Sequence, residues 1–550
     1  MNRRAASMAV LWWAIAMVAA FYPVLLSGGK LMEGYIGDTR LLNYVLEHDY
    51  CWMLGDPHHA SLWNPPYFYP QPDVLAYCDL LLGAVPWYAP WRLAGFLPDT
   101  AYQWWTATIL TLDFTLAWLL LRRLSFSPRA AGAGAFLCAA ASPMVSQFGH
   151  EQMMAEFYPL LSLLGCVDLV RGVRPARAAA GVVGGVVAQI YTAFYAAWFY
   201  AFGLAFVAVV SLGVPAWRRT WLPHWKVLLA AAGVGALAAA PAVAHYLAAS
   251  QAVGVRPMAE VHAMLPRLQS WFYMGPFSVV YSFQCRWSLF AVLQHDQEHR
   301  IGLGLLTTLL VWTGLLGARQ RPVVRAFTLA WIGLFAVTLC LPGGFSVWPL
   351  IHRLVPGAAA LRAIGRVGVA TLPVSALGLA LWVDRRSSVR WVSLVLCLVV
   401  LEQLQFVRIY EKQPVRDDVR TLAQAIPPDA PVFCFLPRSL GPPRSDLSML
   451  NDKWNADAMW ASMACGVPTI NGLSGWWPPG WALHPLDGPL LDEESALRTW
   501  RHQWALGPVA VIQTPIDWDW TDVQLKAYLK QLYPWLRRPG FMRHWRTGLD

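Results

Sequence analysis

The chain has 550 residues, of which 57% are hydrophobic and 13% are charged, and its mean hydropathy is +0.40. A water-soluble protein could not hide so much apolar surface behind so few charges, so the composition excludes that class and predicts an α-helical polytopic membrane protein. The formal net charge is +10. Because no cluster of Lys and Arg with interleaved aromatic residues is present, we expect no nucleic-acid partner.

About eleven apolar runs are predicted to cross the lipid bilayer as helices. They are Met8–Ser27, Ala101–Leu121, Ala130–Phe148, Met153–Val170, Ala178–Ala193, Tyr195–Gly213, Val227–Ala248, Ile301–Gly317, Ala326–Leu341, Val367–Val383 and Trp391–Val407. The stretch from Ala178 to Gly213 is divided into two runs because basic residues flank both of its ends, which requires an even number of crossings.

Basic residues gather in every second connection between these runs, beginning with Arg3 and Arg4. The later clusters are Arg122, Arg123 and Arg129; Arg171, Arg174 and Arg177; Arg218, Arg219 and Lys226; Arg319, Arg321 and Arg325; and Arg385, Arg386 and Arg390. Short basic loops remain in the cytoplasm, so the pattern predicts a cytoplasmic N-terminus and an extracytoplasmic C-terminal region. The length and the basic loops fit a bacterial inner membrane.

Four regions therefore lie outside: the loops 28–100, 249–300 and 342–366, and the C-terminal tail. The first outer loop spans residues 28–100, and its apolar run Val74–Trp91 is predicted as an interfacial or re-entrant helix, because a full crossing would invert every later basic loop. Residues 1–410 form the membrane module, and residues 411–550 are predicted as a small extracytoplasmic α/β domain. In that domain we expect helices at Asp417–Ala425, Glu493–Ala505 and Asp522–Leu536, and strands at Pro431–Leu436 and Val509–Gln513.

Acidic and imidazole side chains mark the predicted outer face. Asp38 lies just beyond the first span, where a carboxylate could act as a general base on a hydroxyl, bind a metal, or remain a solvated loop acid. His150 and Glu151 lie in the turn between the third and fourth spans. They could form a second acid/base or metal group, or belong to a polar turn satisfied by water.

Aromatic and basic residues supply candidate binding groups. Trp63, Asn64 and Tyr69 belong to a proline-rich segment that could form a flat surface for a sugar or pack against helices. Arg362 and Arg366 are four residues apart, so a helix would place both guanidinium groups on one face. They could bind a lipid-linked phosphate or simply reach the headgroups.

Four further charged or imidazole groups have less specific surroundings. Arg256 and Glu260, in a long outer loop, could line a site or be solvated. His295 and His299 could hold a metal ion if their segment is helical, although local spacing supplies no third ligand.

With these features in order, the sequence resembles the GT-C superfamily of membrane glycosyltransferases, and large bacterial membrane proteins within or near it. The resemblance is carried by Gly37-Asp38, Trp63-Asn64-Pro65, Tyr69-Pro70, Gly149-His150 before Pro159, Pro356-Gly357 with Arg362 and Arg366, and Asn471-Gly472-Leu473-Ser474-Gly475. It implies an inverting enzyme that moves a sugar from a polyprenyl-phosphate donor to an envelope glycan, lipid or protein acceptor.

The resemblance also assigns roles. Asp38 matches the acidic residue of the first outer loop, and Val74–Trp91 matches a helix parallel to the membrane. A divalent Mg or Mn ion remains an open cofactor, because no Asp-x-Asp motif is present. Two other functions stay open: a transporter or flippase that uses the charges of Asp113 and Glu402 within predicted spans, and a non-catalytic envelope assembly factor.

Overall fold

The computed structural model of the chain describes residues 3–436, 448–483 and 493–513. The longer apolar helices are α1 (Arg3–Leu26), α4 (Pro98–Arg123), α5 (Pro128–Ala140), α7 (Phe157–Val170), α8 (Pro175–Ile190), α9 (Phe194–Leu212), α11 (Trp225–Val253), α14 (Leu305–Gly317), α15 (Pro322–Thr338), α18 (Leu372–Asp384) and α19 (Val389–Gln403). Proline is the first residue of α4, α5, α8 and α15, where its fixed φ favours a helix and its missing N–H costs nothing.

Each of the eleven predicted runs overlaps one of these helices, so the multi-span helical class is confirmed. Among the residues that the structure describes, six segments are long and apolar enough to cross a membrane: Arg3–Leu26, Pro98–Arg123, Glu151–Val170, Phe194–Leu212, Pro215–Val253 and Ile364–Asp384. Three shorter apolar helices are α8, α14 and α15. The number of crossings and the side on which each loop lies remain predictions.

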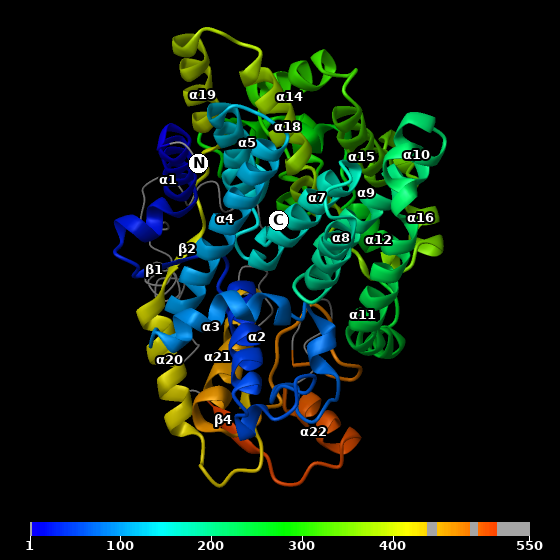
Figure 1. Cartoon of the computed structure of the whole chain (residues 1–550). Helices are drawn as coiled ribbons and strands as arrows, with labels where there is room; N and C mark the ends of the chain where they lie inside the picture. The colour runs from blue at the N-terminus through cyan, green and yellow to red at the C-terminus, as the bar shows by residue number, and fades with distance from the viewer. Residues whose placement is uncertain (1–2, 437–447, 484–492, 514–550) are drawn as a thin grey trace.

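Three of the basic loops meet at one end of the helical bundle. Arg123 Nη2 lies 2.6 Å from Asp168 Oδ1, and the backbone N–H of Ser127 donates to Asp384 Oδ2 at 3.1 Å. Figure 1 shows α5, α14, α18 and α19 toward this end and α2 (Asp38–Met53) toward the other. The grouping of the basic loops agrees with the alternation on which the predicted orientation is based.

The remaining helices are short or lie outside the bundle. They are α3 (Val85–Leu93), α6 (Ser142–Val145), α10 (Pro215–Trp221), α12 (Met258–Ala263), α13 (Ser288–Ala291), α16 (Trp348–Leu354) and α17 (Val367–Ala370). The predicted helix Val74–Trp91 is broken into the 3₁₀ turns Val74–Tyr77 and Leu82–Ala84 followed by α3. Leu81 interrupts it with a positive φ of 57°, so no single helix forms there.

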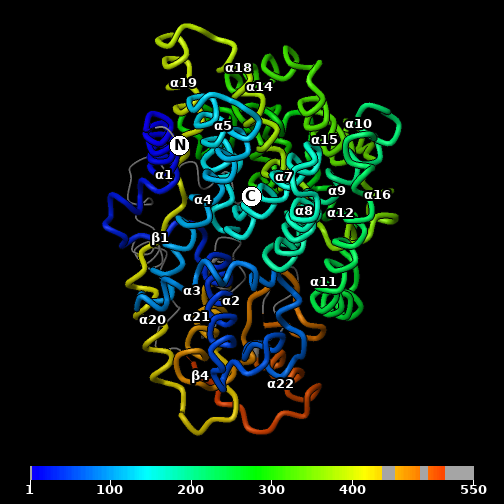
Figure 2. Tube along the Cα trace, viewed as in Figure 1, coloured from blue at the N-terminus to red at the C-terminus, as the bar shows by residue number. Residues whose placement is uncertain are grey.

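The C-terminal region contains α20 (Lys412–Ala425), α21 (Ser448–Cys465) and α22 (Glu493–Gln503), with the parallel strands β3 (Phe433–Leu436) and β4 (Ala510–Gln513). The antiparallel strands β1 (Leu31–Glu33) and β2 (Ile409–Glu411) join its start to the first outer loop (Figure 2). The expected elements around residues 417–425, 431–436, 493–505 and 509–513 are present, whereas Asp522–Leu536 lies outside the described residues. The division into two domains remains a prediction.

Buried charges fasten α2 to α21. Arg40 Nη1 lies 2.7 Å from Asp457 Oδ1, and both side chains are almost fully buried. Lys453 Nζ lies 2.5 Å from Asp457 Oδ2 and 2.8 Å from Asp418 Oδ2. Because charges this deep are stable only when paired, this network fixes the C-terminal region against the first outer loop.

Candidate functional site

A cavity of about 180 Å³ lies where the first outer loop, the turn before α7, the end of α11 and the segment before α17 meet. Its charged and imidazole lining comes from positions far apart in sequence: Asp38, Asp79, His150, Arg256, Arg362 and Arg366. Aromatic side chains, among them Tyr195 and Trp476, complete the wall. A concave site with a few converging polar groups is where ligand binding is expected.

Asp38 is the first residue of α2, and close packing fixes this start. A Cβ atom added to Gly37 would lie 2.7 Å from Asp452 Cβ, so glycine is needed beside α21. Burial, followed by the nearby carboxylate of Asp452, raises the pKa of Asp38 to about 7, against the opposite effect of Arg366 and Arg362. Near neutral pH the carboxyl group is therefore poised between its two protonation states, as a general base requires.

His150 and Glu151 have different surroundings although they are adjacent. His150 Nε2 lies 3.7 Å from Asp38 Oδ2, and burial together with Arg366 lowers the pKa of His150 to about 3, so its ring is neutral. Glu151 is buried and does not line the cavity; it accepts from Thr39 Oγ1 at 2.9 Å and Tyr102 OH at 3.0 Å. Glu151 thus holds the turn and α2 in place, while His150 faces the cavity.

Arg362 and Arg366 reach the same cavity, but not from one face of an α-helix. Arg362 lies in an irregular segment and Arg366 ends the 3₁₀ turn Ile364–Arg366, so the predicted helical spacing is wrong. Arg362 Nη1 lies 2.9 Å from Glu260 Oε1, and Arg366 Nη2 lies 3.3 Å from Glu298 Oε1. The two carboxylates hold the guanidinium groups in place without filling all of their donor positions.

Arg256 adds a third guanidinium group to this wall. Its Nη1 lies 3.6 Å from Glu260 Oε1, so one carboxylate serves both Arg256 and Arg362. Burial and the charge of Arg362 lower the pKa of Arg256 to about 10. The Nε atoms of Arg256 and Arg366 have no hydrogen-bond partner among the residues that the structure describes. Clustered, underused guanidinium donors are suited to an anion such as a phosphate.

The predicted aromatic surface lies elsewhere. The Trp63 ring stacks on His245 with 3.9 Å between centroids, and Asn64 Oδ1 accepts from the backbone N–H of Asp73 at 2.7 Å. The carbonyl of Tyr69 accepts from Trp500 Nε1 at 3.0 Å. Trp63, Asn64 and Tyr69 do not line the cavity, because this segment packs against α11 and the C-terminal region instead.

His295 and His299, the two predicted metal-binding candidates, do not share a site. His295 is exposed, whereas buried His299 uses both ring nitrogens, at 2.9 Å from Ser270 Oγ and 3.1 Å from the carbonyl of Ala263. Their segment is a 3₁₀ turn, so the helical spacing needed for a shared ion does not occur. Within the described ranges, no group of three or more His, Cys, Asp or Glu side chains is arranged to hold a metal ion. Dependence on a divalent ion stays a prediction, and no step is assigned to one.

Two cavity residues were not anticipated as site residues. Asp79 accepts from Gln152 Nε2 at 3.0 Å and from the backbone N–H of Phe194 at 2.8 Å, and burial raises its pKa. The sequence could have indicated this residue, because Asp79 is a charged residue inside the apolar run Val74–Trp91. Trp476 directly follows the motif that ends at Gly475, but nothing local in the sequence indicates that its ring reaches a cavity near the membrane.

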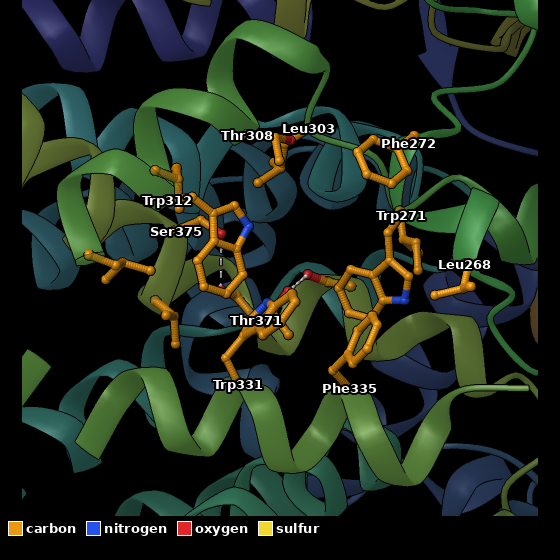
Figure 3. A pocket seen from close by; sticks show the side chains of 15 residues that line it. Leu268, Trp271, Phe272, Leu303, Thr308, Trp312, Trp331, Phe335, Thr371 and Ser375 are labelled. Carbon is orange, nitrogen blue, oxygen red and sulfur yellow. Dashed lines mark hydrogen bonds between the residues drawn. The ribbon is translucent and has the colours of Figure 1, made fainter. Parts of the chain in front are cut away.

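A second cavity, of about 270 Å³, lies among α14, α15, α17 and α18. Its lining is mainly apolar, and Figure 3 shows the aromatic side chains of Trp271, Trp312, Trp331 and Phe335 around it. Gly368 also lines this cavity and lies two residues after Arg366. One short segment of chain thus borders both cavities: Arg366 lines the first cavity, and Gly368 lines the second, which is apolar.

Comparisons with known proteins add similarity to solved structures. No protein-family model and no curated protein matches the sequence. The chain is similar to the crystal structure of ArnT from Cupriavidus metallidurans in the apo state, with 14% identity, a TM-score of 0.38, and coverage of 85% of this chain and 86% of that one. A TM-score below 0.5 does not establish a common function, which must follow from the geometry of the site.

Proposed function

We propose that this chain is a membrane glycosyltransferase that moves a sugar from a polyprenyl-phosphate donor to an envelope acceptor at the outer face of a bacterial inner membrane. The supporting observation is that Asp38, His150, Arg362 and Arg366, distant in sequence, line one cavity. A base beside a cluster of arginines is what transfer from a phosphate leaving group needs. The membrane lipids, the donor and an envelope glycan, lipid or protein acceptor are the partners that this proposal requires.

In this scheme the cationic wall, formed by Arg256, Arg362 and Arg366, binds the donor phosphate. Arg362, Arg366 and Arg256 present N–H groups to one cavity, and their carboxylate partners leave some of those donors unused. Charge-assisted hydrogen bonds hold the phosphate and stabilise the negative charge that grows on it as the sugar departs. The second cavity, which Gly368 lines, offers the lipid chain an apolar environment next to its headgroup.

Asp38 takes the proton in this scheme. As the acceptor hydroxyl oxygen attacks the anomeric carbon, a bond forms between them and the bond from that carbon to the phosphate oxygen breaks. The hydroxyl proton passes to the Asp38 carboxylate, and polyprenyl phosphate leaves with the bonding electrons. Attack opposite to the leaving group inverts the sugar. Neutral His150, 3.7 Å from Asp38, orients the acceptor through a hydrogen bond.

The transporter or flippase remains an alternative because of Asp113. Both of its carboxylate oxygens are buried with no hydrogen-bond partner in the described part of the chain. Glu402, the second charge on which transport would depend, instead accepts from the backbone N–H groups of Leu306 and Thr307 at the start of α14. A non-catalytic assembly factor would keep the cavity but would not depend on the Asp38 carboxylate.

The test compares envelope glycans and lipid-linked sugars in a wild-type strain, a deletion strain and strains carrying Asp38→Asn or Asp73→Asn at matched membrane abundance. Asp73 is the control, because it is an acid of the same outer loop paired with His245 at 2.7 Å and does not line the cavity. We expect Asp38→Asn to reproduce the deletion, with transfer reduced at least about 100-fold, and Asp73→Asn to resemble wild type.

Normal glycans with Asp38→Asn, together with a defect in the deletion, would rule out catalysis by Asp38. The same measurement should then be made on Asp113→Asn, since a defect there would favour transport.

A further inference from the structure

Part of the cavity wall comes from the C-terminal region, whose residues Gly475 and Trp476 line it. We propose that Trp476 contacts the sugar ring of the donor and so contributes to substrate specificity. This inference rests on the proposed function. It assigns the sugar contact to the indole of Trp476, in the C-terminal region, in place of Trp63 in the first outer loop.

Packing on both sides of Trp476 fixes its backbone. Before it, the side chain of Asn471 accepts from the backbone N–H of Phe435 at 2.7 Å and donates to the carbonyl of Phe435 at 2.9 Å. A Cβ atom on Gly472 would lie 2.4 Å from the ring of Phe68, so only glycine fits there. After it, Trp481 Nε1 donates to the carbonyl of Ile470 at 2.9 Å. The segment is therefore held before any ligand binds.

The Trp476 ring is oriented as well as placed. The guanidinium carbon of Arg256 lies 3.5 Å from the ring centroid, and Arg256 Nη2 donates to the carbonyl of Gly475. Glu260 in turn connects Arg256 to Arg362. The indole therefore lies beside Arg256, in the same cavity that Arg362 and Arg366 line.

The chemistry of the ligand follows from this arrangement. A pyranose ring joined to a phosphate carries an apolar face of C–H groups, which packs favourably on the electron-rich face of an aromatic ring. Arg256 covers one face of the indole, and the ring is only partly buried where it lines the cavity, so part of it is exposed to a ligand there. The aromatic segment predicted for this role is already occupied, since Trp63 stacks on His245.

The test separates sugar binding from phosphate binding in the purified full-length protein. Farnesyl phosphate and its glucosyl and mannosyl phosphodiesters are titrated by calorimetry into wild type, Trp476→Ala, Trp476→Phe and the control Trp477→Ala. Trp477 is the adjacent indole, which stacks on Trp481 at 5.1 Å and does not line the cavity. Thermal melting of each variant confirms that it is folded.

We expect wild type to prefer a sugar-bearing probe over farnesyl phosphate. Trp476→Ala should raise the Kd for that probe about tenfold and change the Kd for farnesyl phosphate less than about threefold. Trp476→Phe should retain most of the preference, and Trp477→Ala should resemble wild type.

Three results would overturn the inference while leaving the anion site intact: equal weakening of both kinds of probe, no weakening of either, or a wild type that binds all probes equally. A wild type that binds none of the probes would instead overturn the proposed function, and the inference with it.

Discussion

Asp38 experiences opposing charges, and these determine the pH at which it can work. Burial and Asp452 raise its pKa to about 7, while Arg366 and Arg362 act in the opposite direction. The base form is the carboxylate, whose fraction grows as the pH rises. We therefore expect kcat/KM for transfer to rise about tenfold per pH unit below pH 7 and to level off above it.

The variant Asp452→Asn tests the cause of that profile. Removing a neighbouring negative charge should lower the pKa of Asp38, so the rise should move to lower pH. Transfer assays on membranes buffered between pH 5 and pH 9 would measure both profiles. A wild-type profile that is flat through pH 7, or an inflection unmoved by Asp452→Asn, would contradict this account of Asp38.

Residue chemistry in the sequence predicted part of the cavity. Asp38, His150, Arg362 and Arg366 were found because charged groups near apolar spans are conspicuous and costly. Trp63 stacks on His245 and does not line the cavity, and its aromatic neighbourhood in the sequence fits a sugar-binding surface and helix packing equally well. Composition identifies which side chains can bind a sugar, but only tertiary packing decides which of them is left facing a cavity.

At the scale of single elements, Glu402 supports the start of α14. Its Oε2 accepts from the backbone N–H and the hydroxyl of Thr307, both at 2.7 Å, and its Oε1 accepts from Tyr281 OH at 2.6 Å. A Cβ atom on Gly304 would lie 2.2 Å from Glu402 Cδ, so the adjacent glycine makes room for this carboxylate. Glu402 is therefore an N-terminal acceptor for a helix.

We expect Glu402→Gln to destabilise the protein by about 1–3 kcal/mol, because the amide NH₂ would face donors that now share a carboxylate. Transfer per folded molecule should stay near the wild-type value. Melting temperature in detergent and the envelope glycan profile measure the two effects, with Asp429→Asn in the exposed turn after α20 as a control. A normal melting temperature combined with a lost phenotype would instead favour a transport role for Glu402.

Helix positions were predictable for a reason that does not extend to the site. A run such as Val227–Ala248 is apolar throughout, so its own composition predicts a helix in lipid. The break at Leu81 depends on a backbone conformation within an apolar run, and it was missed. The 3₁₀ turn ending at Arg366 was missed for the same reason, although both arginines do face one cavity.

At the scale of the whole molecule, the cavity is assembled from two ends of the chain. Asp38 comes from the first outer loop, while Trp476 comes from the C-terminal region. No local pattern could reveal this, since the contacts join residues more than 400 positions apart. The ion network centred on Asp457 is what keeps the two parts together.

Arg40→Met tests whether this assembly is needed for function. The substitution keeps much of the side-chain volume but leaves Asp457 with Lys453 as its remaining partner, which should cost about 1–3 kcal/mol. Arg420→Met is the control, because its ion pair with Asp417 at 2.9 Å is exposed and should contribute less than about 1 kcal/mol.

We expect Arg40→Met to lower the melting temperature in detergent and to reduce transfer, although Arg40 does not line the cavity. Loosening of α21 from α2 would displace Asp452 and the segment carrying Trp476 from Asp38. Limited proteolysis should then cleave first between the membrane helices and α20. If Arg40→Met melts and transfers like Arg420→Met, the C-terminal region keeps its place by other contacts, and the cavity does not depend on this ion network.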